Sequence, residues 1–399
     1  MAVFSREAVT IMIQCGQGLE PCCLHELNTK FPGIHVEQNP FGLKGYVSVK
    51  IDNTPALLAR GVKIVNTLRC FEKMHILMQA REVPWEMIPR KDRVEQKIAD
   101  FFDDALSIMP KTGFLRIYGN LAGVAQTPIK EIEITVPVPG FLKAYGFNQA
   151  QIQAIGKKKA RDHGISLVLK KKGIPLLYVK IQPQSIIGLM LLERPPGNFR
   201  LRHVHPTSLF PNYAFALIQE SFVAYWEANP ARPGTTINIV DPFSGAGTIP
   251  LMAWQEREYL ARILGTETDS LAFTGFEKDP DFFSKVRANS EELTTDPSFT
   301  LMNKDFLESG PGFHADMFIT QPPYGLSINI EKDQLYSLYK TLFSWSDTNG
   351  NHGAILGIIS PHTKWISEIS KNTRWHLVKS IPVKEHSVDC TMDIFKLVF

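Results

Sequence analysis

The chain has 399 residues, more than one hydrophobic core usually serves, so two or three domains are expected. Hydrophobic residues make up 44% and charged residues 21%, which is typical of a folded globular protein and excludes a disordered one. The longest apolar runs, such as residues 186–192, are too short to span a bilayer. The opening segment lacks the apolar core and cleavage site of a signal peptide, so a cytoplasmic location is expected.

The charge is divided unevenly along the chain. Residues 1–200 contain 27 Lys and Arg against 17 Asp and Glu, a formal charge of +10, whereas residues 201–399 contain 16 against 23, a charge of −7. This asymmetry favours a first half that binds a polyanion, although a solvated surface gives the same count.

Cysteines and histidines do not indicate a metal site. Five scattered cysteines, two of them adjacent at Cys22 and Cys23, are too few for a disulfide framework and favour buried apolar side chains. The eleven histidines show no ligand spacing, so no metal is expected.

The first half of the chain mixes short strands and helices without strict alternation. Residues 1–70 predict strand, helix, strand, strand and helix, a small α+β unit. Residues 71–192 predict a second α+β unit, in which a helix from Asp92 places Val94, Ile98, Phe101, Phe102 and Ala105 on one face. Residues 193–211, with Pro195, Pro196 and Gly197, are expected to form a linker.

The second half alternates regularly between strands and helices. Apolar strands are expected near residues 236–240, 272–277, 299–305, 316–321 and 353–360. Helices are expected near residues 248–264, 280–293, 334–345 and 364–371, and two strands close the chain. This order predicts an α/β domain over residues 212–399, with a parallel, doubly wound sheet and an antiparallel hairpin at one edge.

The strongest local signal is the segment Asp241–Thr248, which reads DPFSGAGT and joins the first of these strands to a helix. Gly245 and Gly247 allow the backbone to approach a ligand closely, and the helix start offers free N–H groups. Asp241, at the carboxyl end of the strand, is placed to reach the ligand crevice of such a sheet.

Two further acids follow the next two strands. Glu277 is placed to accept hydrogen bonds from both hydroxyls of a ribose, and Asp305 to accept an adenine amino group while Phe306 packs on the ring. Either acid alone is better explained as a helix cap, but three acids that close three successive strands favour a nucleoside-binding site. A nicotinamide cofactor shares this architecture, but the first turn lacks the third glycine of its fingerprint.

The fourth strand ends in Gln321, Pro322, Pro323 and Tyr324. A polar residue before two prolines is common in ordinary turns. Beside a cofactor site, however, a side-chain oxygen and a proline carbonyl can accept both hydrogens of an exocyclic amine and aim its lone pair at a methyl donor. Tyr324 offers a face on which a base can stack.

In this order and spacing, DPFSGAGTIP, GFEKDP, NKDF and QPPYG resemble the motifs of THUMP-domain RNA guanine-N2 methyltransferases. The resemblance extends to the first half, where residues 1–70 are similar to the family's ferredoxin-like domain and residues 71–192 to its THUMP domain. The fold it implies is a Rossmann-like class I methyltransferase domain after two α+β domains. Gln321 stands where the family usually has Asn or Asp.

The resemblance implies S-adenosyl-L-methionine as cofactor and RNA, either tRNA or rRNA, as partner. Asp241, Gly245 and Gly247 would hold the methionine part of the cofactor, Glu277 the ribose and Asp305 the adenine, while Gln321 to Tyr324 would hold the target guanine. The complete set of expected cofactor-binding residues is Asp241, Phe243, Gly245, Gly247, Thr248, Glu277, Lys278, Asp305 and Phe306.

Two basic runs on the THUMP-like segment are the expected RNA contacts. They comprise Lys157, Lys158, Lys159 and Arg161, and then Lys170, Lys171 and Lys172. Each run alone is explained by a solvated face, but together they are suited to hold phosphates.

Two other functions stay open. A DNA adenine-N6 methyltransferase also uses a polar residue before Pro-Pro-Tyr, although no DNA-reading helix is evident in the basic half. An RNA-binding scaffold that kept the fold without activity is the second, and Gln321 is its best support.

Overall fold

The computed structural model describes two compact units, formed by Met1–Cys15 with Leu24–Pro196 and by Gly16–Cys23 with Gly197–Phe399. Within them, the described residues are 8–52, 55–82, 90–107, 121, 131–135, 146–167, 176–181, 184–193, 203, 208–230, 235–291, 294, 296–309, 313–325, 330–385 and 388–399. Lys170, Lys171 and Lys172 lie outside them. No helix in the described part of the chain is long and apolar enough to cross a membrane.

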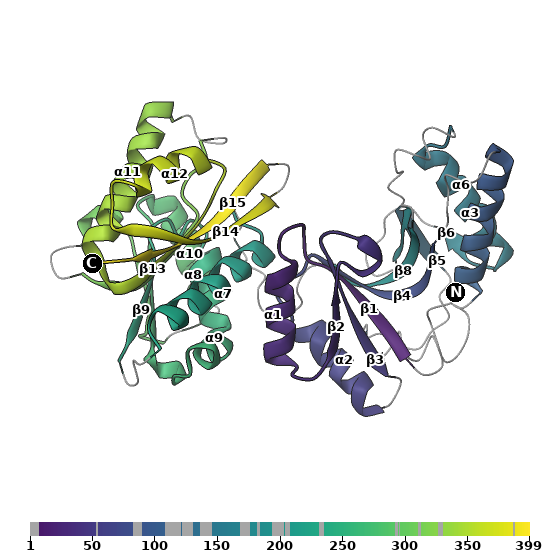
Figure 1. Cartoon of the computed structure of the whole chain (residues 1–399), viewed down its shortest axis with the longest axis horizontal. Helices are drawn as coiled ribbons and strands as arrows, with labels where there is room; N and C mark the ends of the chain where they lie inside the picture. The colour runs from purple at the N-terminus through teal and green to yellow at the C-terminus, as the bar shows by residue number, and fades with distance from the viewer. Residues whose placement is uncertain are drawn as a thin grey trace. The chain divides into compact units, whose positions relative to one another are not determined.

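The strands described in the first unit form a sheet in the order β2-β3-β1-β4-β8-β7-β5-β6 (Figure 1). Most neighbours are antiparallel, while β5 runs parallel to β6 and β7. The expected domain boundary near residue 70 falls between α2 and β4, and β4 pairs with β1. The division into two N-terminal domains stays a prediction. The strands are β1 Ala8–Gln14, β2 His35–Gln38, β3 Tyr46–Asp52, β4 Lys73–Glu82, β5 Glu131–Thr135, β6 Ser166–Leu167, β7 Leu176–Ile181 and β8 Gln184–Glu193.

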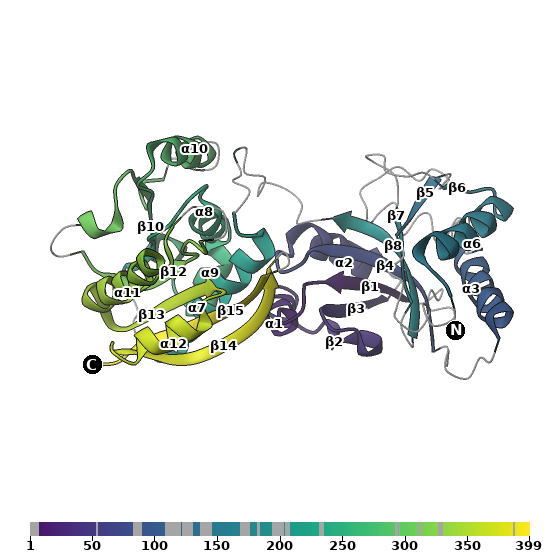
Figure 2. The same cartoon turned by 90° about the horizontal axis from the view of Figure 1, so that it is seen from above.

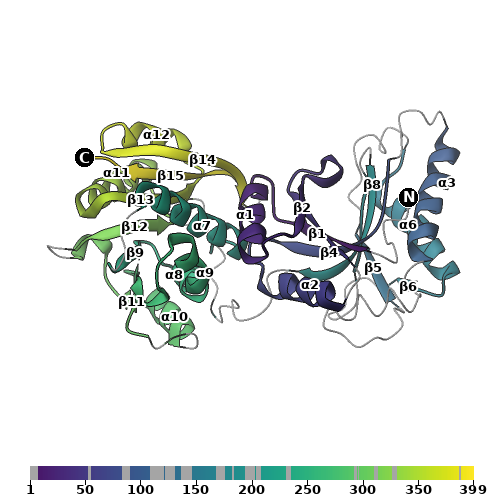
Figure 3. The ribbon, with the colours of Figure 1, turned by 60° about the horizontal axis from the view of Figure 1, so that its bottom comes forward.

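Helices α3 and α6 of this unit lie side by side, as Figures 1 and 3 both show. The face predicted for α3 is confirmed, because Val94, Ile98, Phe101, Phe102 and Ala105 are all buried. Helix α6 begins with a capping box, in which Asn148 and Gln151 each accept the other's backbone N–H. The helical segments are α1 Glu20–Lys30, of which residues 20–23 belong to the second unit, η1 Pro40–Gly42, α2 Pro55–Thr67, α3 Lys91–Leu106 and α6 Gln149–Asp162.

The second unit is the expected α/β domain. The strands described there form a sheet in the order β11-β10-β9-β12-β13-β15-β14, parallel except for β15, which runs antiparallel to both β13 and β14. The closing hairpin is therefore at the sheet edge, as predicted. The strands are β9 Ile237–Asp241, β10 Leu271–Phe276, β11 Phe299–Met302, β12 Ala315–Thr320, β13 Gly350–Ser360, β14 Trp375–Glu385 and β15 Val388–Leu397.

Helices cover both faces of this sheet, with α11 and α12 on one face and α7 and α9 on the other (Figures 1 and 2). Every residue of the central strand β12 is buried, which is typical of a parallel strand covered on both sides. One helix was expected over 248–264, but the segment is divided at Glu256 into α8 and α9. The helical segments are α7 Pro211–Ala228, α8 Thr248–Gln255, α9 Arg257–Leu264, η3 Thr268–Ser270, α10 Pro280–Glu291, η4 Phe306–Glu308, α11 Lys332–Asn349 and α12 Thr363–Ser370.

Candidate functional site

Asp241 ends β9 and is 3% exposed. Its Oδ1 accepts hydrogen bonds from the hydroxyl of Thr320 at 2.7 Å and from the backbone N–H of Phe243 at 3.0 Å. Among the described residues, no hydrogen bond reaches its Oδ2. Burial raises the pKa of this carboxyl to about 7. The two hydrogen bonds lower the pKa, but their effect is smaller than that of burial. Asp241 is thus a buried acid whose second oxygen is available to a cationic or hydrogen-bonding ligand.

The loop after β9 is shaped by its two glycines. Gly247 precedes α8 at φ 87°, and a Cβ there would lie 2.5 Å from a methyl of Val286. Gly245 has φ 51°, and a Cβ there would meet only a carbonyl oxygen 4.0 Å away, so this part of the backbone faces open space. Thr248, the first residue of α8, is buried.

Glu277 follows β10 and reaches back to the glycine loop. Its Oε2 accepts the backbone N–H of Gly245 at 3.0 Å, and its Oε1 accepts that of Asp279 at 2.9 Å. Burial raises the pKa of this carboxyl, while the two N–H groups oppose that shift. A carboxylate has about four acceptor positions, so both oxygens can still accept ligand hydroxyls. The side chain of Lys278, in contrast, is 72% exposed.

Asp305 follows β11 and caps the short helix η4. Its Oδ1 accepts the backbone N–H of Leu307 at 3.1 Å, and its Oδ2 lies 3.9 Å from the Lys278 ammonium. Phe306 is buried edge-on against Phe243, with ring centroids 5.2 Å apart, and against Trp345, at 4.9 Å. The ring of Phe306 is therefore part of the aromatic core. The sequence predicts that the ends of β9, β10 and β11 bind the cofactor. We therefore call them, with Asp241, Gly245, Gly247, Glu277 and Asp305, the cofactor half of the candidate site.

Gln321 to Tyr324 directly follow β12, which pairs with β9. The hydrogen bond from Thr320 to Asp241 joins this turn to the cofactor half, because Thr320 immediately precedes Gln321. Pro322 is buried, and the other three residues are partly buried. The structure thus brings together the four strand ends that the sequence motifs predicted.

Three residues outside the motifs hold this turn. Tyr339 of α11 donates its hydroxyl hydrogen to the carbonyl of Pro323 at 3.2 Å, and a ring nitrogen of His362 lies 2.9 Å from the carbonyl of Tyr324. Glu385, at the end of β14, accepts the hydroxyl hydrogen of Tyr324 at 2.8 Å. Since Gln321–Tyr324 are predicted to hold the target base, we call them, together with Glu385, the target half of the candidate site.

None of these three supporting residues, nor Thr320, was predicted from the sequence. Thr320 is completely buried. The only sequence signal for its role was a hydroxyl residue at the end of the predicted strand, directly before Gln321. The contact of Glu385 with Tyr324 spans 61 residues and depends on how far the terminal hairpin extends, which no local pattern shows.

The basic run on α6 contains residues with two different environments. Lys157, Lys158 and Arg161 are exposed. Lys159 forms an ion pair with Asp103 of α3, to which a ring nitrogen of His163 also lies within 3.1 Å. The hydrogen bond to Asp103 raises the pKa of Lys159. Lys159 therefore links α6 to α3, whereas its three basic neighbours face solvent.

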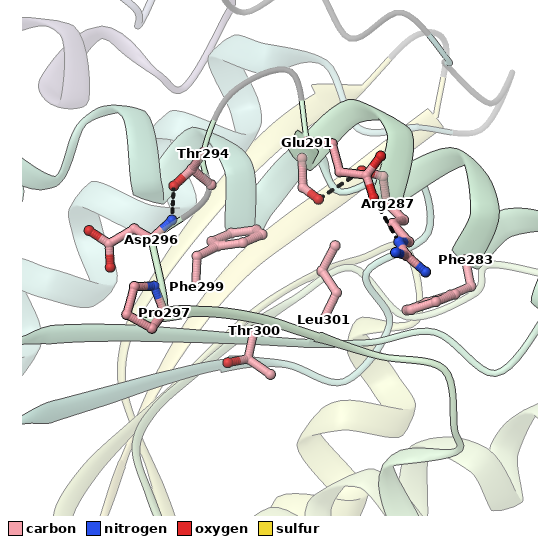
Figure 4. A pocket seen from close by; sticks show the side chains of 10 residues that line it. Phe283, Arg287, Glu291, Thr294, Asp296, Pro297, Phe299, Thr300 and Leu301 are labelled. Atoms are coloured by element: carbon pink, nitrogen blue, oxygen red, sulfur yellow. Dashed lines mark hydrogen bonds and ion pairs between the residues drawn. The ribbon is translucent and has the colours of Figure 1, made fainter.

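One hollow in the described surface of the second unit lies away from these residues. Figure 4 shows this space of about 430 Å³ between α10 and β11, with the ion pair of Arg287 and Glu291, 2.8 Å, at its edge. Its lining residues include none of those predicted to bind cofactor or target. The candidate site is thus identified by its strand ends and hydrogen bonds, not by this hollow.

Comparison with known proteins agrees with the fold. Residues 205–393 match the family UPF0020, described as "RMKL-like, methyltransferase domain". TrmN from Thermus thermophilus is 18% identical with a TM-score of 0.66, over 98% of this chain and 100% of that one. A "possible methylase" from Clostridium difficile 630 is 18% identical with a TM-score of 0.63, over 98% of both chains. SMU.472, a putative methyltransferase solved in complex with SAH, is 16% identical with a TM-score of 0.63, over 98% of both chains. No curated protein matches the sequence.

Residues 205–393 are therefore similar to the RMKL-like methyltransferase domain. They form an S-adenosylmethionine-dependent methyltransferase domain. The fold expected from the sequence is confirmed over nearly the whole chain, with the α/β domain preceded by an α+β region.

Proposed function

We propose that this protein transfers a methyl group from S-adenosylmethionine to the exocyclic N2 of a guanine in structured RNA, either tRNA or rRNA. The observation that carries the proposal is the 2.7 Å hydrogen bond from Thr320 to Asp241. It holds an amine-binding turn directly beside the predicted cofactor residues, which is the arrangement that methyl transfer to an amine requires.

The residues of the cofactor half fit S-adenosylmethionine. Asp241 would accept the cationic amino group of the methionine part, since its Oδ2 and its burial suit a positive ligand. The backbone at Gly245 and Gly247 would lie against the same part, and Glu277 would bind the ribose hydroxyls. Asp305 would accept the adenine amino group. The bound cofactor supplies a methyl group that its sulfonium already activates.

The target half would orient the guanine amine. The side-chain oxygen of Gln321 and a proline carbonyl would accept the two amine hydrogens, so that the nitrogen lone pair points at the methyl group. Tyr324 would stack on the extruded base. No strong base is needed, because the proton can leave after the methyl group has been transferred.

The RNA assignment rests on the first unit. Its resemblance to THUMP-containing enzymes, the charge of +10 over residues 1–200 and the three exposed cations on α6 all favour a polyanionic partner. Phosphate contacts of this kind recognise shape and backbone, while the pocket reads the extruded base.

The test is methyl transfer by the purified full-length protein from methyl-labelled cofactor to RNA or DNA, followed by nucleoside identification. We expect label in N2-methylguanosine from RNA. Label in N6-methyladenine from DNA would replace our proposal with the DNA enzyme. Binding of RNA and cofactor without transfer to any nucleic acid would favour the scaffold.

A further inference from the structure

Glu385 is a buried acid, 2% exposed, that connects the terminal hairpin to the target half. Its Oε2 accepts the hydroxyl hydrogen of Tyr324 at 2.8 Å and lies 3.5 Å from Nε2 of Gln321, a long hydrogen bond. The backbone N–H of Phe210, just before α7, also bonds this carboxylate. Three separate segments of the second unit therefore meet at one side chain.

The hydrogen bond to Gln321 has a definite polarity. Nε2 of Gln321 donates to Oε2 of Glu385, which leaves the carbonyl oxygen of the amide at the opposite end. Turned the other way, Gln321 would present NH2 to the target amine, and two donors would face each other. Only the first orientation accepts a hydrogen from the amine.

We propose that Glu385 is a positioning residue, which fixes the Gln321 amide with its oxygen toward the target amine and fixes the Tyr324 ring through its hydroxyl. This inference rests on the proposed function, in which Gln321 accepts an amine hydrogen. Compared with the Asn or Asp that is usual in the resembled family, Gln321 has one more methylene, which extends its amide toward Glu385. A buried carboxylate is costly unless it is hydrogen-bonded, and Glu385 is hydrogen-bonded by both Tyr324 and Phe210.

The kinetic test uses Glu385→Gln, which keeps the size of the side chain but brings an NH2 group of its own. We expect kcat for RNA methylation to fall at least about tenfold, with KM for RNA and Kd for cofactor within about twofold of wild type. In a Gln321→Ala background, the same change should lower kcat by a clearly smaller factor, because only the contact of Glu385 with Tyr324 is left to lose. Wild-type turnover of Glu385→Gln, or losses that multiply, would overturn the proposal.

The matched control is Asp393→Asn on β15. Asp393 is also a buried acid, 3% exposed, that accepts hydrogen bonds from two side chains, Ser380 and Thr391, but it does not touch the motif. Its substitution should leave kcat unchanged. An equal loss of kcat in this control would show that the Glu385 effect is general destabilisation and would count against positioning.

A second measurement does not depend on activity. Tyr324→Phe should lower the melting temperature by about 2–4 °C in the wild-type protein and by less than half as much in a Glu385→Ala background. If Glu385→Ala does not fold, Glu385→Met replaces it at similar volume. An equal decrease in melting temperature in both backgrounds would show that Tyr324 and Glu385 do not interact. If the wild type methylates no RNA but the coupling is present, the proposed function fails while the positioning contact stands.

Discussion

The two halves of the site are held in different ways. In the cofactor half, Glu277 and Asp305 accept backbone N–H groups from nearby loops, so the main chain fixes the site. In the target half, Gln321 and Tyr324 depend on the side chain of Glu385, which is 64 and 61 residues distant. A substitution in the cofactor half should therefore weaken ligand binding, whereas one in the target half should disturb orientation and rate.

The largest expected effect is on cofactor binding. Under the proposed function, Glu277→Ala would remove two ribose contacts, each worth about 1.5–3 kcal/mol when charge-assisted. Affinity for S-adenosylmethionine, measured by calorimetry, should therefore fall at least about a hundredfold. Asp279→Ala is the matched control, because this acid caps α10 through the N–H groups of Asp281 and Phe282. Unchanged affinity in Glu277→Ala would mean that this acid does not bind the cofactor.

In the target half, Gln321→Ala should act on rate alone. The rate of methyl transfer in a single turnover should fall at least about tenfold, while affinities for cofactor and RNA change little, as expected when orientation in the transition state is lost. The exposed Gln334 on α11 provides a control substitution to alanine that should have no effect. A weakened cofactor affinity in Gln321→Ala would remove the distinction between the two halves.

The pKa of Asp241 leads to a pH-dependent difference in stability. Burial raises this pKa from 3.8 to about 7, so the folded domain binds a proton more tightly than the unfolded chain. The stabilising effect of the neutral acid is fully present below about pH 4 and is lost as the pH rises towards 7. The variant Asp241→Asn lacks this titration. Without cofactor, its free energy of unfolding minus that of the wild type should therefore increase as the pH rises from about 4 to 7, by at most about 1.4 kcal/mol per pH unit. Urea unfolding at several pH values measures this, and a constant difference would contradict the raised pKa.

The smallest expected effects are on RNA binding by α6. Substitution of Lys157, Lys158 and Arg161 by Gln should weaken binding a few-fold and reduce the salt slope by up to about 0.9 per lost phosphate contact. Lys159→Gln should leave the slope nearly unchanged, because its charge is paired with Asp103. Fluorescence anisotropy at several salt concentrations distinguishes these variants. Equal slopes for all of them would show that the three exposed cations are merely solvated.

The sequence was sufficient to predict the parallel sheet, the edge hairpin and the four strand ends, because strand–helix alternation and turn residues are local signals. Glu256, where the predicted helix divides into α8 and α9, has no glycine or proline to indicate a break. Glu385 could not be predicted, since its role arises only when the terminal hairpin pairs with β13 and brings it to Tyr324. The ion pair of Lys159 with Asp103 likewise depends on the packing of α6 against α3.

The most direct test of methylation at guanine N2 is mass spectrometry of nucleosides from tRNA and rRNA of cells that lack this protein. We predict that N2-methylguanosine decreases in one of these RNA classes and is restored by the wild-type protein but not by Gln321→Ala. Unchanged N2-methylguanosine in both classes, together with a loss of another methylated nucleoside, would contradict our account.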